Sequence, residues 1–472
     1  MRCLRPSSVR LAICLLALAS QARASEEEAR GAPLSLEAVL DAVEASHPGL
    51  EAAARKAQAA RGKVQAAKGA WDPSFELKTR WAPIGYYENR QVDVAVQQAT
   101  PWWGIRGFAG YRAGWGDFPV YKGEYETLSQ GELRAGVDVP LWKDGPIDAQ
   151  RAELQKREQL TDAARCALRE KRLKLRYDAA KAYWKWVETG LEMRIQRDLL
   201  NVAQLRDSGL REQVAAGSIA EIVAVDNTRL LLDRESKLVE AQRAFAKASL
   251  ALSLFLRDDE ARPVSPGEER IPEWIAPSGQ VGSASEKGDV EEALTHRPEL
   301  CVAAQERDAA EVGERYARNQ RAPEARAYAM VARDLGEGPE RLAQAEFAAG
   351  VTLKLPVALR KARGDHAAAK AELLGSQANL RGTRDRVATE VRQARIDLTL
   401  ARSQVELAKR QLAAARQLAE AEREKFRHGA TDLVIVNLRE LAAADAARLE
   451  VAALAAAQQA YAAYLTALGR GI

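Results

Sequence analysis

Apolar positions spaced at a helical period dominate this chain. They predict long helices over roughly 36–70, 148–256, 289–321 and 361–470, and a glycine breaks the second and fourth stretches near Gly217 and Gly429. In the fourth stretch the apolar residues recur at alternating four- and three-residue steps: Val387, Val391, Ala394, Leu398, Ala401, Val405, Ala408, Leu412, Ala415 and Ala419. This period of 3.5 residues predicts a left-handed coiled coil, in which the arms on either side of each glycine pair as a helical hairpin.

A two-residue alternation of apolar and polar positions marks two shorter regions. In the first half it runs through Phe75–Trp81 and Leu133–Val139, and a shorter counterpart covers residues 325–331 and 345–355. Such alternation predicts β-strands. A proline closes each region, at Pro140 and Pro356, where a strand can end without losing a ladder hydrogen bond.

The same order of signals occurs twice along the chain. His47-Pro48-Gly49-Leu50 opens a helical stretch that stops at Pro73, and Arg297-Pro298-Glu299-Leu300 opens another that stops at Pro323. Since Gly217 and Gly429 then precede matching helices, we predict a duplicated unit of one strand pair and one long helical hairpin. The first β region is 34 residues longer. We place this insertion at about 83–130, as a long loop or an extra hairpin, and otherwise expect four strands per chain.

These boundaries give a provisional domain map. It consists of a signal peptide at 1–24, a first repeat at 25–256 with strands at about 74–142 and a hairpin at 148–256, a connector at 257–288, and a second repeat at 289–472 with strands at about 324–356 and a hairpin at 361–470.

Composition supports long helices and a secreted chain. Charged residues make up 29% of the chain and aromatics 6%, and the formal net charge of +4 gives no sign of a nucleic-acid surface. Arg2, Arg5 and Arg10, the apolar run 11–19 and Ala22-Arg23-Ala24 predict a cleaved signal peptide. Cleavage leaves Cys166 and Cys301 in non-equivalent positions of the two repeats, which favours isolated buried thiols over a bridge.

Catalytic chemistry finds no support in the motifs. The four histidines (His47, His296, His366 and His428) lack the spacing of zinc or catalytic motifs, and no nucleophile elbow, P-loop or CxxC occurs. We therefore predict a protein that is not an enzyme, with no catalytic residue, no cofactor and no metal.

Aromatic residues concentrate where the strand pattern appears. Residues 71–142 hold 14 of the 27 Trp, Tyr and Phe side chains. Packing inside a soluble β domain is one explanation. Anchoring at a membrane interface is the other, and its candidates are Trp81, Trp102, Trp103, Trp115 and Trp142. The mature chain has no uncharged run long enough for a membrane helix, so membrane passage requires the strands. Four strands cannot close a barrel, and several chains would have to share one.

This order of elements resembles the TolC-type outer-membrane efflux protein family. The residues that carry the resemblance are the two proline motifs at 47–50 and 297–300, Pro73, Val139-Pro140-Leu141, Leu355-Pro356-Val357, Gly217 and Gly429. The resemblance implies a mainly α fold with a β-barrel portion, assembled as a homotrimer with a 12-stranded barrel in the outer membrane of a Gram-negative cell. It also implies a periplasmic helical tunnel, a periplasmic adaptor and an inner-membrane pump.

Two functions remain open at this stage. One is the passive exit duct of a tripartite efflux or type I secretion system, in contact with outer-membrane lipid and energised by the pump. The other is a periplasmic coiled-coil adaptor or structural protein without channel activity. The sequence does not reveal the exported substrate.

The duct hypothesis assigns roles to the hairpin tips. Glu221, Asp226 and Asp432 are candidates for a pore constriction, because each would recur three times around one axis. The competing explanation is an acidic first turn of a helix facing solvent. Candidates for adaptor contact are Gly217, Ser218, Gly429 and Ala430.

Overall fold

The computed structural model describes residues 32–119, 125–258, 260–282, 285–355 and 357–472. The predicted signal peptide at 1–24 and the strand-ending Pro356 lie outside these residues. Over these residues the fold is mainly helical with one six-stranded antiparallel sheet, which confirms the predicted fold class. Its main elements are α2 (Leu36–Ser46), α3 (Pro48–Lys68), β1 (Ser74–Ala82), β2 (Asn89–Ala99), β3 (Arg106–Gly116), β4 (Glu132–Pro140), α4 (Ala149–Ala215), α5 (Glu221–Ser253), α6 (Glu286–His296), α7 (Pro298–Asn319), β5 (Glu324–Asp334), β6 (Glu346–Lys354), α8 (Arg360–Arg427) and α9 (Leu433–Ala467).

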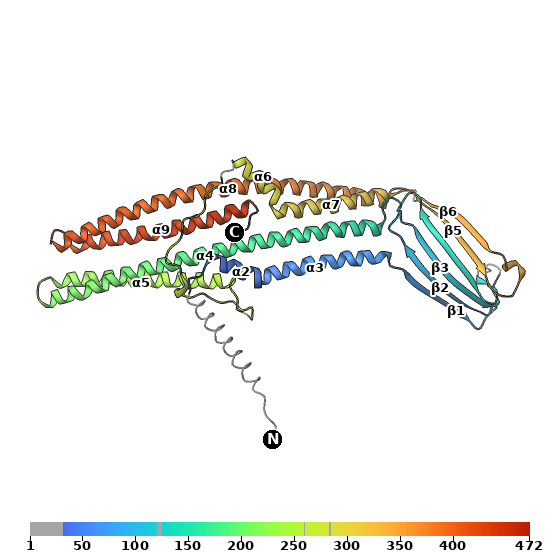
Figure 1. Cartoon of the computed structure of the whole chain (residues 1–472), viewed down its shortest axis with the longest axis horizontal. Coiled ribbons are helices and arrows are strands. Elements are labelled where there is room, and N and C mark those ends of the chain that lie inside the picture. Colours follow the sequence, from blue (N-terminus) through green and yellow to red (C-terminus); the bar gives the residue numbers. More distant parts are fainter. Residues whose placement is uncertain (1–31, 120–124, 259, 283–284, 356) are drawn as a thin grey trace, which may run out of the picture. The chain divides into compact units, whose positions relative to one another are not determined.

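The chain divides into two compact units, and each takes segments from both repeats. Of the described residues, those within 32–52, 169–297 and 386–472 form unit 1, and those within 53–168 and 298–385 form unit 2. Unit 1 therefore holds the hairpin ends of the long helices, whereas unit 2 holds the sheet and the helical segments that lead into it (Figure 1).

The two proline motifs break their helices in the same way. The predicted stretches 36–70 and 289–321 each form two helices, because His47 and Arg297 are extended (ψ 121°) and Pro48 and Pro298 begin the next helix. A residue before proline is disfavoured in the helical region, while proline suits the first helical position. The preceding helices also start alike, with Ser35 and Ser285 as N-caps that accept from backbone N–H groups at 3.2 Å.

The long helices pack along the predicted seam in unit 1. Eight of the ten seam positions on α8 are buried, and Ala401 and Ala415 are half-buried. Val405 and Ala408 form one hydrophobic cluster with Ala453 and Ala457 of α9, which closes the hairpin. Alanine at these positions lets the two backbones approach closely, and the apolar contact holds the arms together.

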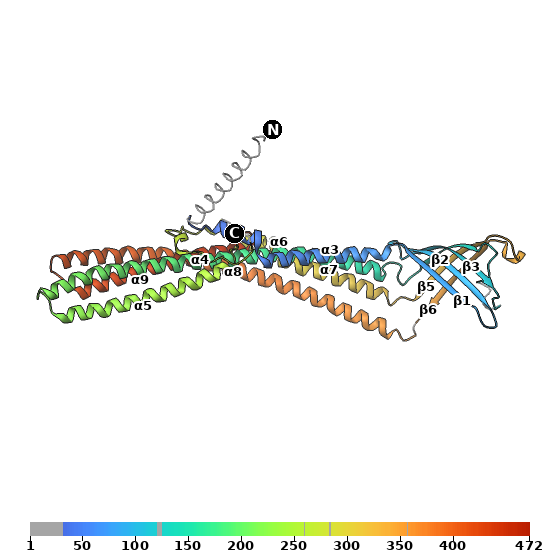
Figure 2. The same cartoon turned by 90° about the horizontal axis from the view of Figure 1, so that it is seen from below.

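The sheet corrects the expected strand count from four to six. The insertion forms an additional hairpin, β2 and β3, rather than a loop, and Figures 1 and 2 show this hairpin beside β1. The strand order is β1-β2-β3-β4-β5-β6. Every neighbouring pair is antiparallel, and the β4–β5 pairing joins the two repeats. The outer edges of β1 and β6 are nine residues long each.

No helix within the described residues combines the length and the apolarity that a membrane span requires.

Candidate functional site

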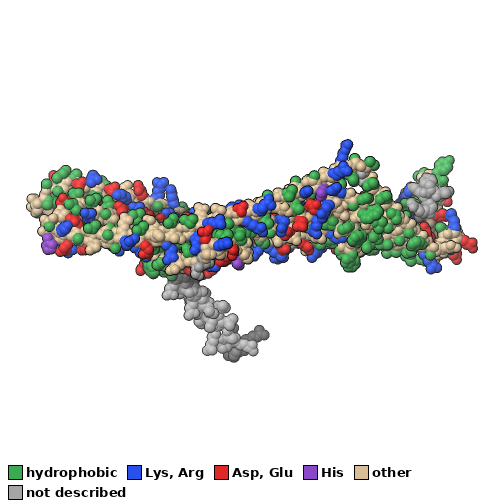
Figure 3. Space-filling model, turned by 90° about the horizontal axis from the view of Figure 1, so that it is seen from above, with side chains coloured by type: hydrophobic (Ala, Val, Ile, Leu, Met, Phe, Trp, Pro, Cys, Tyr) green, Lys and Arg blue, Asp and Glu red, His purple; other side chains and the backbone are tan. Residues whose placement is uncertain are grey.

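The sheet of unit 2 has one apolar face and one polar face. Antiparallel partners share a face, so the register assigns every strand position. The apolar side chains of the first face are Phe75, Leu77, Trp81, Val92, Val94, Val96, Tyr111, Trp115, Leu133, Ala135, Val137, Val331, Phe347, Val351 and Leu353, and Thr79, Arg90 and Arg333 share this face. Many of these side chains are exposed, with Phe75 at 69% and Phe347 at 70%. Hydrophobic side chains accordingly gather over the strands in Figure 3. Exposed apolar patches of this kind mark interaction or membrane surfaces.

The opposite face carries charged side chains that pair with one another. Asp93 of β2 is only 6% exposed and accepts hydrogen bonds from Arg112 of β3 (Nη2–Oδ2, 3.1 Å) and from Arg134 of β4. Toward the strand ends near the helices, Arg326 of β5 forms an ion pair with Asp138 of β4. Buried charges require such partners, because an unpaired charge away from water is costly. The polar face is thus an internally paired, water-compatible surface.

Aromatic side chains lie at both ends of the sheet. At the end away from the helices, Trp81 is 79% exposed and Trp115 lies under the guanidinium of Arg90, with 5.3 Å between Arg90 Cζ and the ring centroid. At the helix end, Trp102 and Trp103 occupy the β2–β3 turn.

The helix end of the sheet is a tight junction. The indole Nε1 of Trp103 donates to the carbonyl of Pro140 at 2.9 Å, and exposed Trp142 follows two residues later. Gly104 has a positive φ of 69°, and a Cβ there would meet the carbonyl oxygen of Asp144 at 2.7 Å. All five predicted interfacial tryptophans therefore lie at the ends of the strands, and the β2–β3 turn is fixed against the end of β4.

The two hairpin tips of unit 1 have the same backbone geometry. Gly217 (φ 69°) and Gly429 (φ 72°) each end a helix in the left-handed conformation, which glycine adopts without steric cost. The N–H of Ser218 reaches back to the carbonyl of Gln213 and that of Ala430 to the carbonyl of Lys425, both at 2.9 Å. Both tips lie at one end of unit 1 (Figure 1). The structure thus places the four predicted contact residues in equivalent, exposed turns.

The three predicted pore acids occupy different environments. Asp432 is the N-cap of α9 and accepts from the N–H of Ile435 at 3.0 Å. Asp226 forms an exposed ion pair with Arg229 at 3.1 Å. Glu221 is exposed in the first turn of α5. Two of the three side chains therefore have local structural partners.

Unit 1 also contains a buried ionic cluster that was not predicted from the sequence. Glu440 of α9 is 3% exposed and accepts from Arg206 of α4 (2.7 and 3.0 Å) and from Arg423 of α8 (2.9 Å), and Arg234 of α5 lies 4.0 Å away. Burial alone would raise the pKa of Glu440, but the hydrogen bonds from Arg206 and Arg423 outweigh it and lower the pKa. The Glu440 cluster therefore links all four helices of the two hairpins.

Arg234 is the most deeply buried member of the Glu440 cluster. Its side chain is 1% exposed, and Nη1 donates to the carbonyl of Leu199 at 3.0 Å. Removal from water lowers its pKa, and nearby Glu440 opposes that shift. The only signal in the sequence was an acid within an apolar helix face, since its partners lie in three other helices.

The two cysteines form a disulfide, contrary to the prediction of isolated thiols. Cys166 of α4 and Cys301 of α7 both belong to unit 2, and their Cα atoms are 5.9 Å apart, within the range for a bridge. The prediction failed because non-equivalent positions in the two repeats meet when α4 and α7 pack against each other. The bridge joins the first repeat to the second.

The histidines have local structural partners. His47 Nδ1 accepts from the N–H of Gly49 at 3.0 Å, and His366 lies 3.0 Å from Glu314. Among the described residues no group of three or more His, Cys, Asp or Glu side chains could hold a metal ion.

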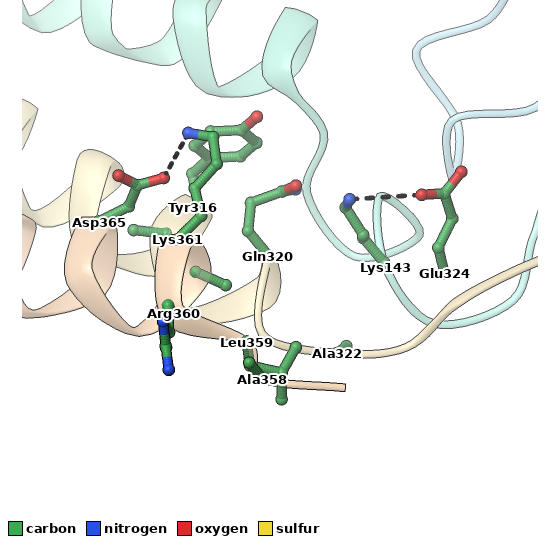
Figure 4. Close-up of a pocket in the computed structure, with 12 residues that line it drawn as sticks. Lys143, Tyr316, Gln320, Ala322, Glu324, Ala358, Leu359, Arg360, Lys361 and Asp365 are labelled. Carbon is green, nitrogen blue, oxygen red and sulfur yellow. Dashed lines mark hydrogen bonds and ion pairs between the residues drawn. The ribbon is translucent and has the colours of Figure 1, made fainter. Parts of the chain in front are cut away.

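A pocket of about 610 Å³ lies in unit 2, where α7 and α8 meet the chain segments that enter and leave the sheet. Figure 4 shows Lys143 paired with Glu324 (3.6 Å) on one side and Lys361 paired with Asp365 (2.9 Å) on the other. Burial is the main cause that raises the pKa of the adjoining Tyr316. The pocket carries no cluster of reactive groups and fits a structural junction.

Residues 290–470, the second repeat, match the family model described as outer membrane efflux protein. Solved structures similar to the chain include the outer-membrane channel OprN (17% identity, 92% of this chain and 90% of that chain, TM-score 0.66) and the CmeC outer membrane channel of Campylobacter jejuni (13%, 93% and 86%, TM-score 0.67). The outer membrane protein VceC of Vibrio cholerae is also similar (17%, 92% and 96%, TM-score 0.63). At these identities the structural matches establish the fold. No curated protein sequence matches the chain.

Proposed function

We propose that this chain is the passive exit duct of a tripartite efflux or type I secretion system, because its second repeat matches the outer membrane efflux protein model and its fold is similar to that of outer-membrane channels. In this proposal the chain lies in the outer membrane and acts as a channel rather than as an enzyme. In this proposal three copies assemble around one axis. Their sheets form a barrel in the outer membrane, and their helical hairpins form a tunnel in the periplasm.

The two-faced sheet is the observation that carries the proposal. An outward apolar face with aromatic side chains at both ends suits lipid, and an inward polar face with paired charges suits water. Membrane-spanning strands need every backbone group paired, so exposed sheet edges are costly in lipid. The equal edges of β1 and β6 favour pairing between neighbouring copies, which removes both edges.

The partners follow from the passive nature of a duct. The chain carries no motif for nucleotide hydrolysis, so a separate inner-membrane pump would supply the energy and a periplasmic adaptor would connect the two. We propose the equivalent turns at Gly217, Ser218, Gly429 and Ala430 as the adaptor contacts, and Glu221, Asp226 and Asp432 as the acids at the periplasmic mouth. In this proposal the pump, and not the duct, selects the chemical class of the exported substrate.

Reconstitution of the purified, full-length chain tests this proposal. We expect an SDS-resistant trimer in the outer-membrane fraction that conducts ions in a planar bilayer. Recovery as a soluble periplasmic monomer without conductance would overturn the proposal and favour the coiled-coil adaptor or structural protein instead.

A further inference from the structure

We propose that the β2–β3 hairpin is part of the membrane wall and contacts lipid, so that the assembled barrel has 18 strands instead of the 12 that two strands per repeat would give. This inference rests on the proposed trimeric channel. The six strands that each chain contributes form one uninterrupted sheet, and the additional hairpin lies inside it rather than at its edge.

The apolar face continues across the hairpin without a break. The register aligns Leu77 of β1 with Val94 of β2, Val94 with Tyr111 of β3, and Tyr111 with Leu133 of β4. Val96 on β2 is 46% exposed, comparable to Leu133 at 53% on β4. A hairpin that projected into water would not need apolar side chains on this face. We therefore infer that the apolar face of the hairpin contacts the same lipid as the neighbouring strands.

The hairpin is also bonded to the strands on both sides. β2 pairs with β1 at nine positions and β3 pairs with β4 at seven. On the polar face, Asp93 of β2 accepts a hydrogen bond from Arg134 of β4, whose side chain reaches across β3. Removing the hairpin from the wall would break these hydrogen-bond ladders and would leave the buried carboxylate of Asp93 without Arg134 as its partner.

The strand lengths fit the thickness of a membrane. β2 and β3 are 11 residues long each, and a tilted membrane strand needs about 9–11 residues. Arg90, beside Trp115, and Arg106 mark the two ends of the hairpin, where charged side chains reach the interfaces. The hairpin is therefore long enough to span the membrane and is no longer than that.

The proposal predicts a wider barrel. With strands spaced about 4.8 Å apart and tilted by about 40°, 18 strands give a diameter of about 36 Å and 12 strands about 24 Å. Three symmetry-related sites on the wall are then about 31 Å apart in the first case and about 21 Å apart in the second.

Interspin distances in the intact trimer test the strand count. Leu77→Cys on β1 and, separately, Val351→Cys on β6 are labelled with a nitroxide, while Cys166 and Cys301 remain in their disulfide. Both positions belong to the wall whether or not the hairpin does. We expect a distance near the larger value at both sites, and a distance near the smaller value would overturn the inference while leaving the channel intact. The absence of any interspin distance would overturn the proposed trimer and this inference with it.

Label accessibility along the hairpin provides a second, independent readout. We expect Val92→Cys, Val94→Cys and Val96→Cys to collide with lipid-soluble oxygen, and Gln91→Cys and Gln97→Cys to collide with a water-soluble nickel chelate. The matched control is Leu77→Cys against Lys78→Cys on β1, which must alternate if the sheet spans the membrane at all. Alternation on β1 together with water access at every β2 position would exclude the hairpin from the wall. No alternation on β1 would reject the proposed channel.

Discussion

At the scale of single residues, the buried carboxylate of Glu440 is expected to contribute to stability. In Glu440→Gln, Arg206 loses its ion pair, Arg423 keeps only the exposed pair with Glu420, and Arg234 loses the buried carboxylate beside it. Removing one partner of a buried ion pair costs about 3 kcal/mol, whereas an exposed pair contributes less than about 1 kcal/mol. We therefore expect a clear fall in the thermal midpoint, followed by circular dichroism, and almost none for Asp226→Asn, which breaks only the exposed pair with Arg229. Equal midpoints for the two variants would contradict a structural role of the Glu440 cluster.

The pH dependence of this contribution follows from the pKa of Glu440. The pKa is lowered in the folded protein, so the unfolded chain binds the proton more readily at acid pH. The contribution is complete above the unfolded pKa of about 4.3 and is lost as pH falls through the lower folded value. We expect the gap in thermal midpoint between the parent chain and Glu440→Gln to stay constant from neutral pH to about pH 5 and to shrink below pH 4. A gap that widens in acid would reverse the assigned sign.

Glycines of the first hairpin should respond to alanine in opposite directions. Gly217 has a φ of 69° and open space around its Cα, so Gly217→Ala meets no clash but costs about 1 kcal/mol of backbone strain. Gly209 lies inside α4 with equally open space, and Gly209→Ala should stabilise the helix by about 1 kcal/mol. Hydrogen exchange of the α4 amides near the tip measures both changes. The same sign for both variants would show that the turn at Gly217 is not in the left-handed conformation.

At the scale of elements, the Cys166–Cys301 bridge is a staple between the α4 and α7 segments of unit 2. It closes a loop of 135 residues in sequence, for which chain entropy alone predicts stabilisation of about 5 kcal/mol. We expect Cys166→Ser/Cys301→Ser to lower the thermal midpoint of the oxidised protein. The parent chain in reductant should match the double variant, and reductant should not change the variant further. A parent chain that is insensitive to reductant, with no midpoint change in the variant, would contradict the stapling role.

How far the elements were predictable depended on how local their signals are. Pro48 and Pro298 each interrupt a helix within one residue. The apolar seam from Val387 to Ala419 repeats within two helical turns. Both features could therefore be predicted from residues close together in the sequence. In β3, by contrast, glycine and alanine fill many positions between Gly107 and Gly116, and the two-residue period is weak there. Only pairing with β2 and β4 reveals β3 as a strand, since side-chain packing across neighbouring strands is the main stabilising contribution.

Long-range contacts explain what the sequence did not predict about the candidate site. The disulfide and the Glu440 cluster join residues more than 130 positions apart, as in Cys166–Cys301 and Arg206–Glu440. No local period encodes which residue of one helix faces which residue of another. The tip turns were predictable because Gly217 and Gly429 are short-range helix stops.

At the scale of the whole molecule, the proposed trimer turns small local differences between the tip acids into a difference in ion selectivity. Each acid would appear three times around the axis, and a ring of carboxylates attracts cations. Asp432 is turned back onto the backbone of α9 as an N-cap and Asp226 pairs with Arg229, so Glu221 is the acid of the three whose carboxylate is best placed to face the lumen. We therefore expect Glu221→Gln to lower the permeability of K⁺ relative to Cl⁻ by a few fold, measured as the reversal potential across a KCl gradient in a planar bilayer.

The isosteric controls are Asp226→Asn, which removes a charge already neutralised, and Asp432→Asn, which removes a charge but keeps a capping side chain. Both should shift the reversal potential less than Glu221→Gln does. A reversal potential unchanged in Glu221→Gln, with the trimer and its conductance intact, would place that carboxylate outside the ion path and reduce it to an ordinary acidic first turn that stabilises the helix dipole.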